Sequence, residues 1–121
     1  MTARARAWRV RLTAAAESDF QDILYWTAGR FGAAQARVYA DTLSAALQAL
    51  TAGPTVLGAK LRDDIAEGAF TLHVARGGRK GRHFVVFRVG KDEGREVIEV
   101  LRLLHDAMDL PRHVPPPDEP Q

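Results

Sequence analysis

The stretch EVIEVLRLLHDAMD, residues 96–109, constrains the fold of this chain more than any other. From Val97 to Leu104 it is apolar on both alternating sides, and only Glu99 and Arg102 interrupt it. A strand with one solvated face would alternate apolar and polar residues, so the run predicts a central strand that is covered on both sides. Pro111 cannot continue a ladder of backbone hydrogen bonds. The polar residues between the strand and this proline are therefore the first place to look for function.

Two amphipathic helices are predicted in the first half of the chain. Thr13 is a suitable N-cap for the first helix, and apolar residues at helical spacing follow it. Tyr25 and Trp26 fall partly off this apolar face, and Gly29 and Gly32 bracket the end of the helix.

The second helix is predicted from about residue 33 to residue 50, where Gly53-Pro54 stops it. Because only a few residues separate the two helices, they must form an antiparallel hairpin.

Alternation of apolar and polar residues predicts three further strands. These strands span residues 8–12, 70–74 and 83–89. A basic, glycine-rich loop over residues 76–82 joins the second strand to the third, and residues 90–94 turn the chain into the last strand. The last three strands therefore form an antiparallel meander. Residues 55–69 carry charges and glycines and are predicted to be a connection.

The element order β-α-α-β-β-β predicts an α+β, two-layer domain with a helical hairpin packed on one face of the sheet. With 46% hydrophobic and 26% charged residues, the 121-residue chain fits one domain over residues 1–110. Residues 111–121 hold five prolines and are predicted to be a flexible tail. Two helices cover one sheet face only. The other face is then an open groove for a partner, or residues 55–69 and the tail cover it.

Charge is segregated along the sequence although the net charge is only +2. Residues 1–12 carry four arginines and no acid, and residues 76–95 carry seven basic and two acidic residues. Such segments predict contact with an acidic partner, either protein or nucleic acid. The absence of cysteine excludes disulfides and thiolate chemistry. No apolar run reaches the roughly 18 residues of a membrane span or resembles a signal peptide, so we expect a cytoplasmic protein without membrane contact.

Several motifs resemble the ParE branch of the RelE/ParE toxins of bacterial type II toxin–antitoxin systems. The most specific is VLRLLHxxMD at residues 100–109, and the resemblance covers about residues 8–113. Two further motifs, VxLTxxA at residues 10–16 and RHFVVFRV at residues 82–89, support it. The resemblance implies the same element order that the residue patterns predict.

The resemblance also implies a function and two partners. A toxin of this branch binds DNA gyrase, stabilises its complex with cleaved DNA and so blocks replication, with plasmid stabilisation as a family role. A cognate, ParD-like antitoxin with a ribbon-helix-helix part lays a helical segment over the toxin. We expect these partners to contact the basic hairpin and the exit of the last strand. The predicted partner-binding residues are Arg79, Lys80, Arg82, Arg88, Arg102, His105, Met108 and Asp109.

The related RelE-type toxins are ribosome-dependent RNases, which gives an enzymatic alternative. Cleavage of RNA through its 2′-hydroxyl needs a general acid and base, and cations at the scissile phosphate. For this role the chain offers Lys60, Arg62, Arg82, Arg102 and His105. The C-terminal tyrosine of many RNase members is missing, because Tyr25 and Tyr39 fall on helices. We therefore expect a non-enzymatic toxin, with an mRNA interferase and a non-toxic binding module as alternatives.

Two residues of the last motif also have a structural interpretation. His105 would fix the turn by a hydrogen bond to Asp106 or Asp109. Arg102, which interrupts an apolar strand, would either pair with an acid across the sheet near Glu99 or contact a ligand.

The basic loop at residues 76–82 does not fit a nucleotide site, because it joins two strands and lacks a Gly-Lys-Ser/Thr ending. The aromatics nearest to it, Phe84 and Phe87, have the pattern of core residues, so the signal for nucleic-acid binding is weak. We expect a solvated hairpin tip, with contact to antitoxin, gyrase or DNA as the alternative. The four histidines lack metal-ligand spacing and the chain has no cysteine, so no metal is expected. We also expect no cofactor and no small-molecule substrate.

Overall fold

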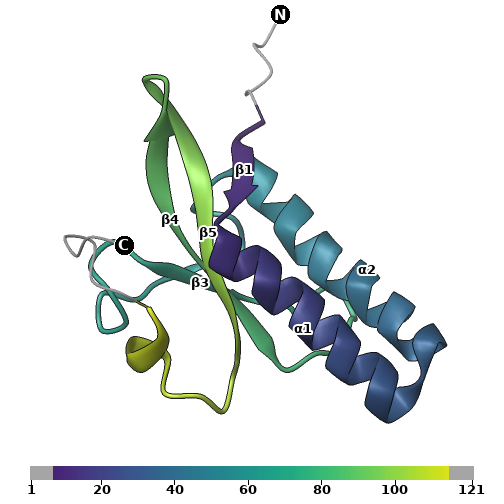
Figure 1. Cartoon of the computed structure of the whole chain (residues 1–121). Coiled ribbons are helices and arrows are strands. Elements are labelled where there is room, and N and C mark those ends of the chain that lie inside the picture. The colour runs from purple at the N-terminus through teal and green to yellow at the C-terminus, as the bar shows by residue number, and fades with distance from the viewer. Residues whose placement is uncertain (1–6, 115–121) are drawn as a thin grey trace, which may run out of the picture.

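The computed structural model describes residues 7–114 and confirms the α+β architecture, with a helical hairpin on one face of a sheet (Figure 1). The elements in chain order are β1 (Arg9–Leu12), α1 (Ala14–Phe31), α2 (Ala33–Ala49), the 3₁₀ turn η1 (Leu50–Ala52), β2 (Lys60–Leu61), β3 (Phe70–His73), β4 (His83–Asp92), β5 (Arg95–His105) and the 3₁₀ turn η2 (Leu110–His113).

The sheet has the strand order β1-β5-β4-β3-β2, and its β3-β4-β5 part is the predicted antiparallel meander. β1 lies on the other side of β5 and runs parallel to it, so β5 is central and the sheet is mixed. The prediction of four strands was wrong by one, because β2 forms within residues 55–69 and pairs with β3. A strand of two residues carries no periodicity from which it can be predicted.

Thr13 both starts α1 and ties it to the central strand. Its Oγ1 accepts the Ala16 N–H at 3.1 Å, which confirms the predicted N-cap, and it donates to the Leu101 carbonyl at 2.9 Å. Gly32 separates the helices with a φ of 94°, a conformation that favours glycine. Within residues 7–114, no helix combines the length and apolar character that crossing a membrane would require.

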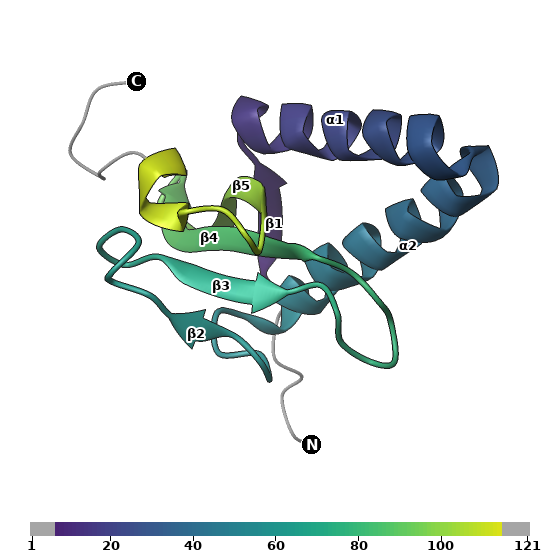
Figure 2. The same ribbon diagram turned by 90° about the horizontal axis from the view of Figure 1, so that it is seen from below.

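The main core lies between the helical hairpin and the sheet (Figure 2). Leu43 and Ala46 of α2 pack there against the fully buried strand residues Val85, Phe87 and Val100. Ala16 is the buried contact of α1, and Phe20, Ile23 and Leu24 pack beside it, as the predicted helical stripe requires.

A smaller core covers the opposite face of the sheet. Its buried residues are Ile65, Ala69, Val86, Leu104, Leu110 and Val114. The open-groove interpretation of this face was therefore wrong, and cover by residues 55–69 and the C-terminal segment is confirmed. The packed part of the chain continues past residue 110 to Val114, and the rest of the predicted flexible tail, residues 115–121, lies outside the described residues.

A β-bulge in β5 determines which side chains of the last motif face the helices. Val86 pairs with Arg102 and Phe87 pairs with Val100, so Leu101 is one extra residue on β5. The extra residue shifts the alternation, and Leu103 joins the core under the helices just as Val100 does. The bulge thus sets the direction of the side chains at the exit of the strand.

Candidate functional site

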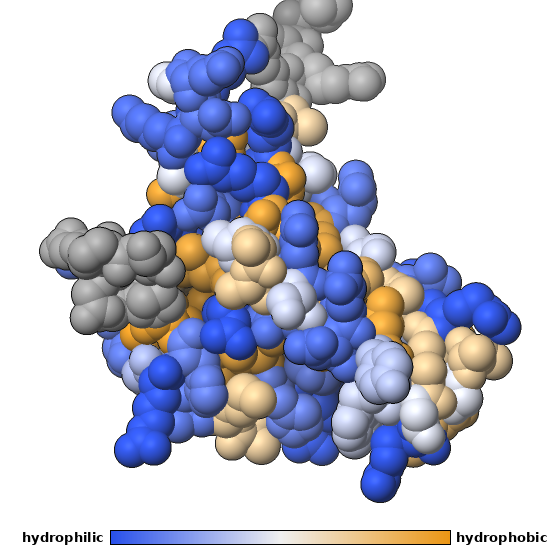
Figure 3. Space-filling view, viewed as in Figure 1, coloured by the Kyte–Doolittle hydropathy of each residue, from blue (hydrophilic) through white to orange (hydrophobic). Residues whose placement is uncertain are grey.

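A groove of about 990 Å³ lies between the helical hairpin, the β3–β4 loop and the exit of β5. α1 contributes Ile23, Trp26 and Phe31 to its walls, and α2 contributes Tyr39. The remaining contributors include Arg79, Lys80, Arg82, His83, Arg102, Leu104, His105 and Met108. Figure 3 shows apolar and weakly polar side chains gathered over the far end of the helical hairpin, beyond the sheet.

Most of the predicted partner-binding residues meet in this groove. Arg79, Lys80, Arg82, Arg102, His105 and Met108 line it. Two others do not. Arg88 lies farther along β4, where its Nη2 is 2.9 Å from Glu99 Oε1, and Asp109 is exposed with Oδ2 3.5 Å from Arg112 Nε. The groove therefore groups six of the eight predicted residues around one space.

The predicted RNase residues do not form one constellation. Lys60 and Arg62 lie at the β2 edge of the sheet, where the Arg62 guanidinium binds Asp64 with an Nη2–Oδ2 distance of 2.8 Å. Arg82, Arg102 and His105 are at the groove instead. Cations that stabilise one scissile phosphate must surround it, and these five residues are divided between two places.

Arg102 connects three elements of the domain. Its Nε and Nη2 donate to the two carboxylate oxygens of Asp19 on α1 at 2.7 and 2.9 Å, and its Nη1 donates to the His113 carbonyl at 3.0 Å. Asp19 also accepts the Leu103 N–H at 3.0 Å. The hydrogen bond to Asp19 raises the pKa of Arg102. The prediction of an acidic partner is confirmed, but the acid belongs to α1 and not to a neighbouring strand.

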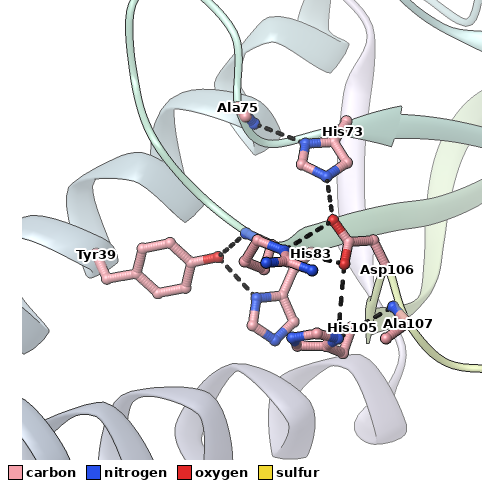
Figure 4. A network of polar contacts seen from close by, with 8 residues as sticks. Tyr39, His73, Ala75, His83, His105, Asp106 and Ala107 are labelled. Carbon is pink, nitrogen blue, oxygen red and sulfur yellow. Dashed lines mark hydrogen bonds and ion pairs between the residues drawn. The ribbon is translucent and has the colours of Figure 1, made fainter.

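Backbone donors fix the proton positions of two histidines in the network of Figure 4. The Ala75 N–H donates to His73 Nδ1 at 3.0 Å, and the Ala107 N–H donates to His105 Nδ1 at 3.1 Å. A ring nitrogen that accepts an N–H carries no proton, so each ring has its proton on Nε2. His105 fixes the turn as predicted, although its partner is a backbone N–H and not Asp106 or Asp109.

Tyr39 fixes the tautomer of the third histidine. The Arg82 N–H donates to Tyr39 Oη at 3.1 Å, and Tyr39 Oη lies 2.7 Å from His83 Nδ1. We assign the hydroxyl as the donor in the second contact, because this ring nitrogen is the acceptor within reach of its hydrogen. Burial lowers the pKa of His83 to about 4, and the neighbouring His105 adds to this effect. The ring is thus neutral at pH 7, with its proton on Nε2. Burial also raises the pKa of Tyr39, which keeps the hydroxyl protonated.

Asp106 joins the loop to the strand exit. It accepts hydrogen bonds from His73 Nε2 at 3.0 Å and Arg82 Nε at 3.2 Å, and these contacts lower its pKa. Its own N–H donates to the Arg82 carbonyl at 2.8 Å. His105 Nδ1 is 3.6 Å from Asp106 Oδ1, which is too long for a hydrogen bond. The basic hairpin is therefore anchored at its base by Asp106 and Tyr39.

Four groove residues with aromatic or imidazole rings were not among the predicted site residues: Trp26, Phe31, Tyr39 and His83. The aromatics nearest to the basic loop along the chain, Phe84 and Phe87, are packed in the two cores. The fold instead brings rings from both helices to the loop. The available signal was the position of Trp26 off the apolar face of its helix, which predicts exposure, and its side chain is 59% exposed.

The groove is equipped for recognition. It offers apolar walls, a cationic loop and the Nε2–H groups of His83 and His105, which find no hydrogen-bond acceptor among residues 7–114. Within the same part of the chain, no group of three or more His, Cys, Asp or Glu side chains is arranged to hold a metal ion.

Comparison with known proteins gives a family match and a structural match. The family model for the "ParE toxin of type II toxin-antitoxin system, parDE" matches residues 10–110. Among solved structures, the YoeB/ParE toxin from Agrobacterium tumefaciens aligns with a TM-score of 0.52 and 17% sequence identity, covering 80% of this chain and 96% of that chain. At this identity the structural likeness shows the fold alone. A search of curated proteins found no match.

Proposed function

Because the chain belongs to the ParE toxin family of type II toxin–antitoxin systems, we propose that it poisons DNA gyrase in the cytoplasm, blocks replication and is neutralised by a ParD-like antitoxin. Plasmid stabilisation would follow, since cells that lose the antitoxin gene are then inhibited by the remaining toxin. The observation that carries this proposal is the groove between the helical hairpin and the β5 exit, which gathers six predicted partner-binding residues.

The walls of the groove support an amphipathic antitoxin segment as one occupant. Trp26, Phe31 and Met108 are 59%, 61% and 46% exposed, although all three are large apolar residues. Exposed apolar groups gathered in a groove favour burial by a partner helix. Arg79 and Lys80 on the opposite rim would meet acids on the outer side of such a helix.

The arrangement of charged groups supports a binding mode of toxicity over RNA cleavage. Arg82 and Arg102 each donate to a carboxylate of the same domain, Asp106 and Asp19 respectively. Releasing the Arg102 guanidinium for a phosphate would leave the mostly buried Asp19 carboxylate without its cation, which costs free energy. Lys60 and Arg62 lie at a distant edge of the sheet. We therefore assign no catalytic residue.

The experiment that tests the proposal is the supercoiling of relaxed plasmid by gyrase in the presence of the purified chain. We expect inhibition together with accumulation of cleaved DNA, and reversal by the antitoxin encoded beside the toxin gene. The variant Lys80→Glu reverses a charge on the groove rim and should weaken the antitoxin complex about tenfold. Lys60→Glu makes the same change at the β2 edge and serves as its control.

Two outcomes would contradict the proposal. A folded chain that leaves gyrase unaffected and cleaves ribosome-bound mRNA would establish the RNase alternative. A folded chain that does neither, yet binds its antitoxin, would indicate a non-toxic binding module.

A further inference from the structure

Five rings from four elements line the groove. Trp26 and Phe31 of α1 are edge to face with centroids 6.0 Å apart. Tyr39 of α2 and His83 of β4 have centroids 5.6 Å apart, and His83 and His105 of β5 have centroids 5.3 Å apart. The first pair is mostly exposed, and the other three rings lie deeper, beside the hydrogen-bond network of Figure 4.

Cations face these rings from the β3–β4 loop. Arg79 and Lys80 are exposed, and neither forms an ion pair with any residue in the range 7–114. Arg30 adds a third cation at the aromatic end, with its guanidinium carbon 5.6 Å from the Trp26 centroid. Since Asp106 binds only Nε of Arg82, this residue also keeps part of its guanidinium toward the groove.

The acids of the groove do not neutralise this charge. Four cationic and two acidic side chains line it, and one of the acids, Asp19, is already bound by Arg102. The remaining acid, Asp22, is exposed on α1. The Nε2–H groups of His83 and His105 add two hydrogen-bond donors at the floor, where Figure 4 shows both rings on the side of the network that faces α1.

We propose that this groove binds single-stranded nucleic acid. Unpaired bases stack on the exposed rings of Trp26 and Phe31, because every base has a π-face. The phosphates of the strand lie along Arg79 and Lys80 and accept the imidazole N–H groups of the floor. A duplex does not fit this chemistry, since its bases are already stacked and paired. The proposal goes beyond gyrase poisoning and does not depend on it. A helical antitoxin segment in the same groove would displace the strand.

The test is fluorescence anisotropy of a labelled oligothymidylate of about twelve nucleotides, titrated with the full chain. We expect saturable binding at about 50 mM salt that weakens steeply by about 200 mM, because bound phosphates release counterions. Lys80→Ala should weaken binding about three- to tenfold and reduce the salt slope by about one. Lys60→Ala removes another exposed lysine, at the β2 edge, and should leave the affinity unchanged.

A second pair of variants tests stacking. Trp26→Ala should weaken binding about five- to a hundredfold, and Trp26→Phe should restore most of the loss because it keeps a ring. Tyr25→Ala changes the adjacent aromatic, which is 86% exposed but outside the groove, and should have no effect. Trp26 is itself 59% exposed, so these changes leave the core intact.

Three results would overturn the proposal. The first is absence of binding by the folded chain at low salt. The second is an equal effect of Lys60→Ala and Lys80→Ala, or of Tyr25→Ala and Trp26→Ala, which would show general attraction without a site. The third is retention of the oligonucleotide by the saturated toxin–antitoxin complex, which would place nucleic-acid binding elsewhere and leave the groove as a peptide site. A gyrase assay plays no part in these readouts, so this proposal and the proposed function can fail separately.

Discussion

At the scale of single residues, the roles of the histidines follow from neighbours that are distant in sequence. The sequence predicted that His105 fixes the strand exit, and it does. The sequence contained no signal for the register that places His83 opposite His105. Nor did it contain a signal for the contact between Tyr39 and His83, which are 44 residues apart in the chain. Proton positions on these rings depend on backbone donors such as Ala75 and Ala107, and any residue but proline would supply the same N–H.

Arg102 shows what a charge pattern in the sequence can and cannot predict. An arginine inside an apolar strand predicts a carboxylate partner, because a buried charge without a partner is costly. Which carboxylate it binds is a property of the fold: the partner Asp19 lies 83 residues earlier, on the helix that crosses β5. The sequence therefore predicts the type of contact at this position but not its partner.

His83 makes the stability of the fold depend on pH. Its pKa is about 4 in the folded chain and about 6.5 when unfolded, so the unfolded state binds more protons between these values. The part of the free energy of unfolding that depends on neutral His83 is fully present above pH 6.5 and is lost as the pH falls toward 4. Urea denaturation should show about 1–2 kcal/mol less free energy of unfolding at pH 5 than at pH 7 from this group. In His83→Asn, the amide oxygen still accepts the Tyr39 hydroxyl but does not titrate, and most of this loss should disappear. Equal losses in both proteins would assign the pH dependence to other groups.

At the scale of elements, length decided what the sequence could predict. The starts of both helices and the end of α2 were predicted to within about a residue, and α1 ends between the two glycines that were predicted to bracket its end. Helices of 17 or 18 residues carry several turns of apolar periodicity. The turn η2 and strand β2 are four and two residues long and have no such signal. The bulge at Leu101 was not predicted either, since it depends on the pairing of β5 with β4. The turn η2 helps to cover the sheet face opposite the helices, and the bulge sets the direction of the β5 side chains.

Leu110 should carry much of the stability of the second face. It is 6% exposed and belongs to the small core with Val86 and Leu104. Leu110→Ala should reduce the free energy of unfolding by about 2–4 kcal/mol, because it removes buried apolar contacts and leaves a cavity. Leu57→Ala makes the same change at a side chain that is 87% exposed and should cost less than about 0.5 kcal/mol. Similar values for the two variants in urea denaturation would show that η2 does not pack on the sheet in solution.

Because the C-terminal segment covers the second face of the sheet, a C-terminal truncation would affect folding as well as partner binding. A chain that ends before Asp106 lacks Leu110 and Val114 from the second core, and it lacks the carboxylate that binds His73 and Arg82. Loss of toxicity in such a chain would report unfolding as readily as a lost contact with the target. Point variants in the groove separate the two effects.

At the scale of the whole molecule, much of the basic charge is neutralised within the domain. On the face away from the helices, Glu99 binds both Arg11 and Arg88, and Asp92 binds Arg9. Although burial acts to raise it, the pKa of Glu99 is lowered overall by the hydrogen bonds from the two arginines. The basic runs of the sequence thus differ in how far acids of the same domain pair with them. The described part of the first run is paired with acids, and the β3–β4 loop keeps exposed cations beside the groove.

The two tryptophans report on separate ends of the molecule and so locate a bound partner. Trp8 packs against the main core next to β1, and Trp26 lies in the groove. In Trp8→Phe, where Trp26 is the only fluorophore of its kind, saturating antitoxin should reduce acrylamide quenching severalfold, because a partner in the groove covers a side chain that is now 59% exposed. In Trp26→Phe, the same antitoxin should leave quenching of Trp8 unchanged. The antitoxin used must itself lack tryptophan, or carry phenylalanine in its place. Protection of Trp8 without protection of Trp26 would move the partner surface to the β1 edge, and the groove would then be free in the neutralised complex.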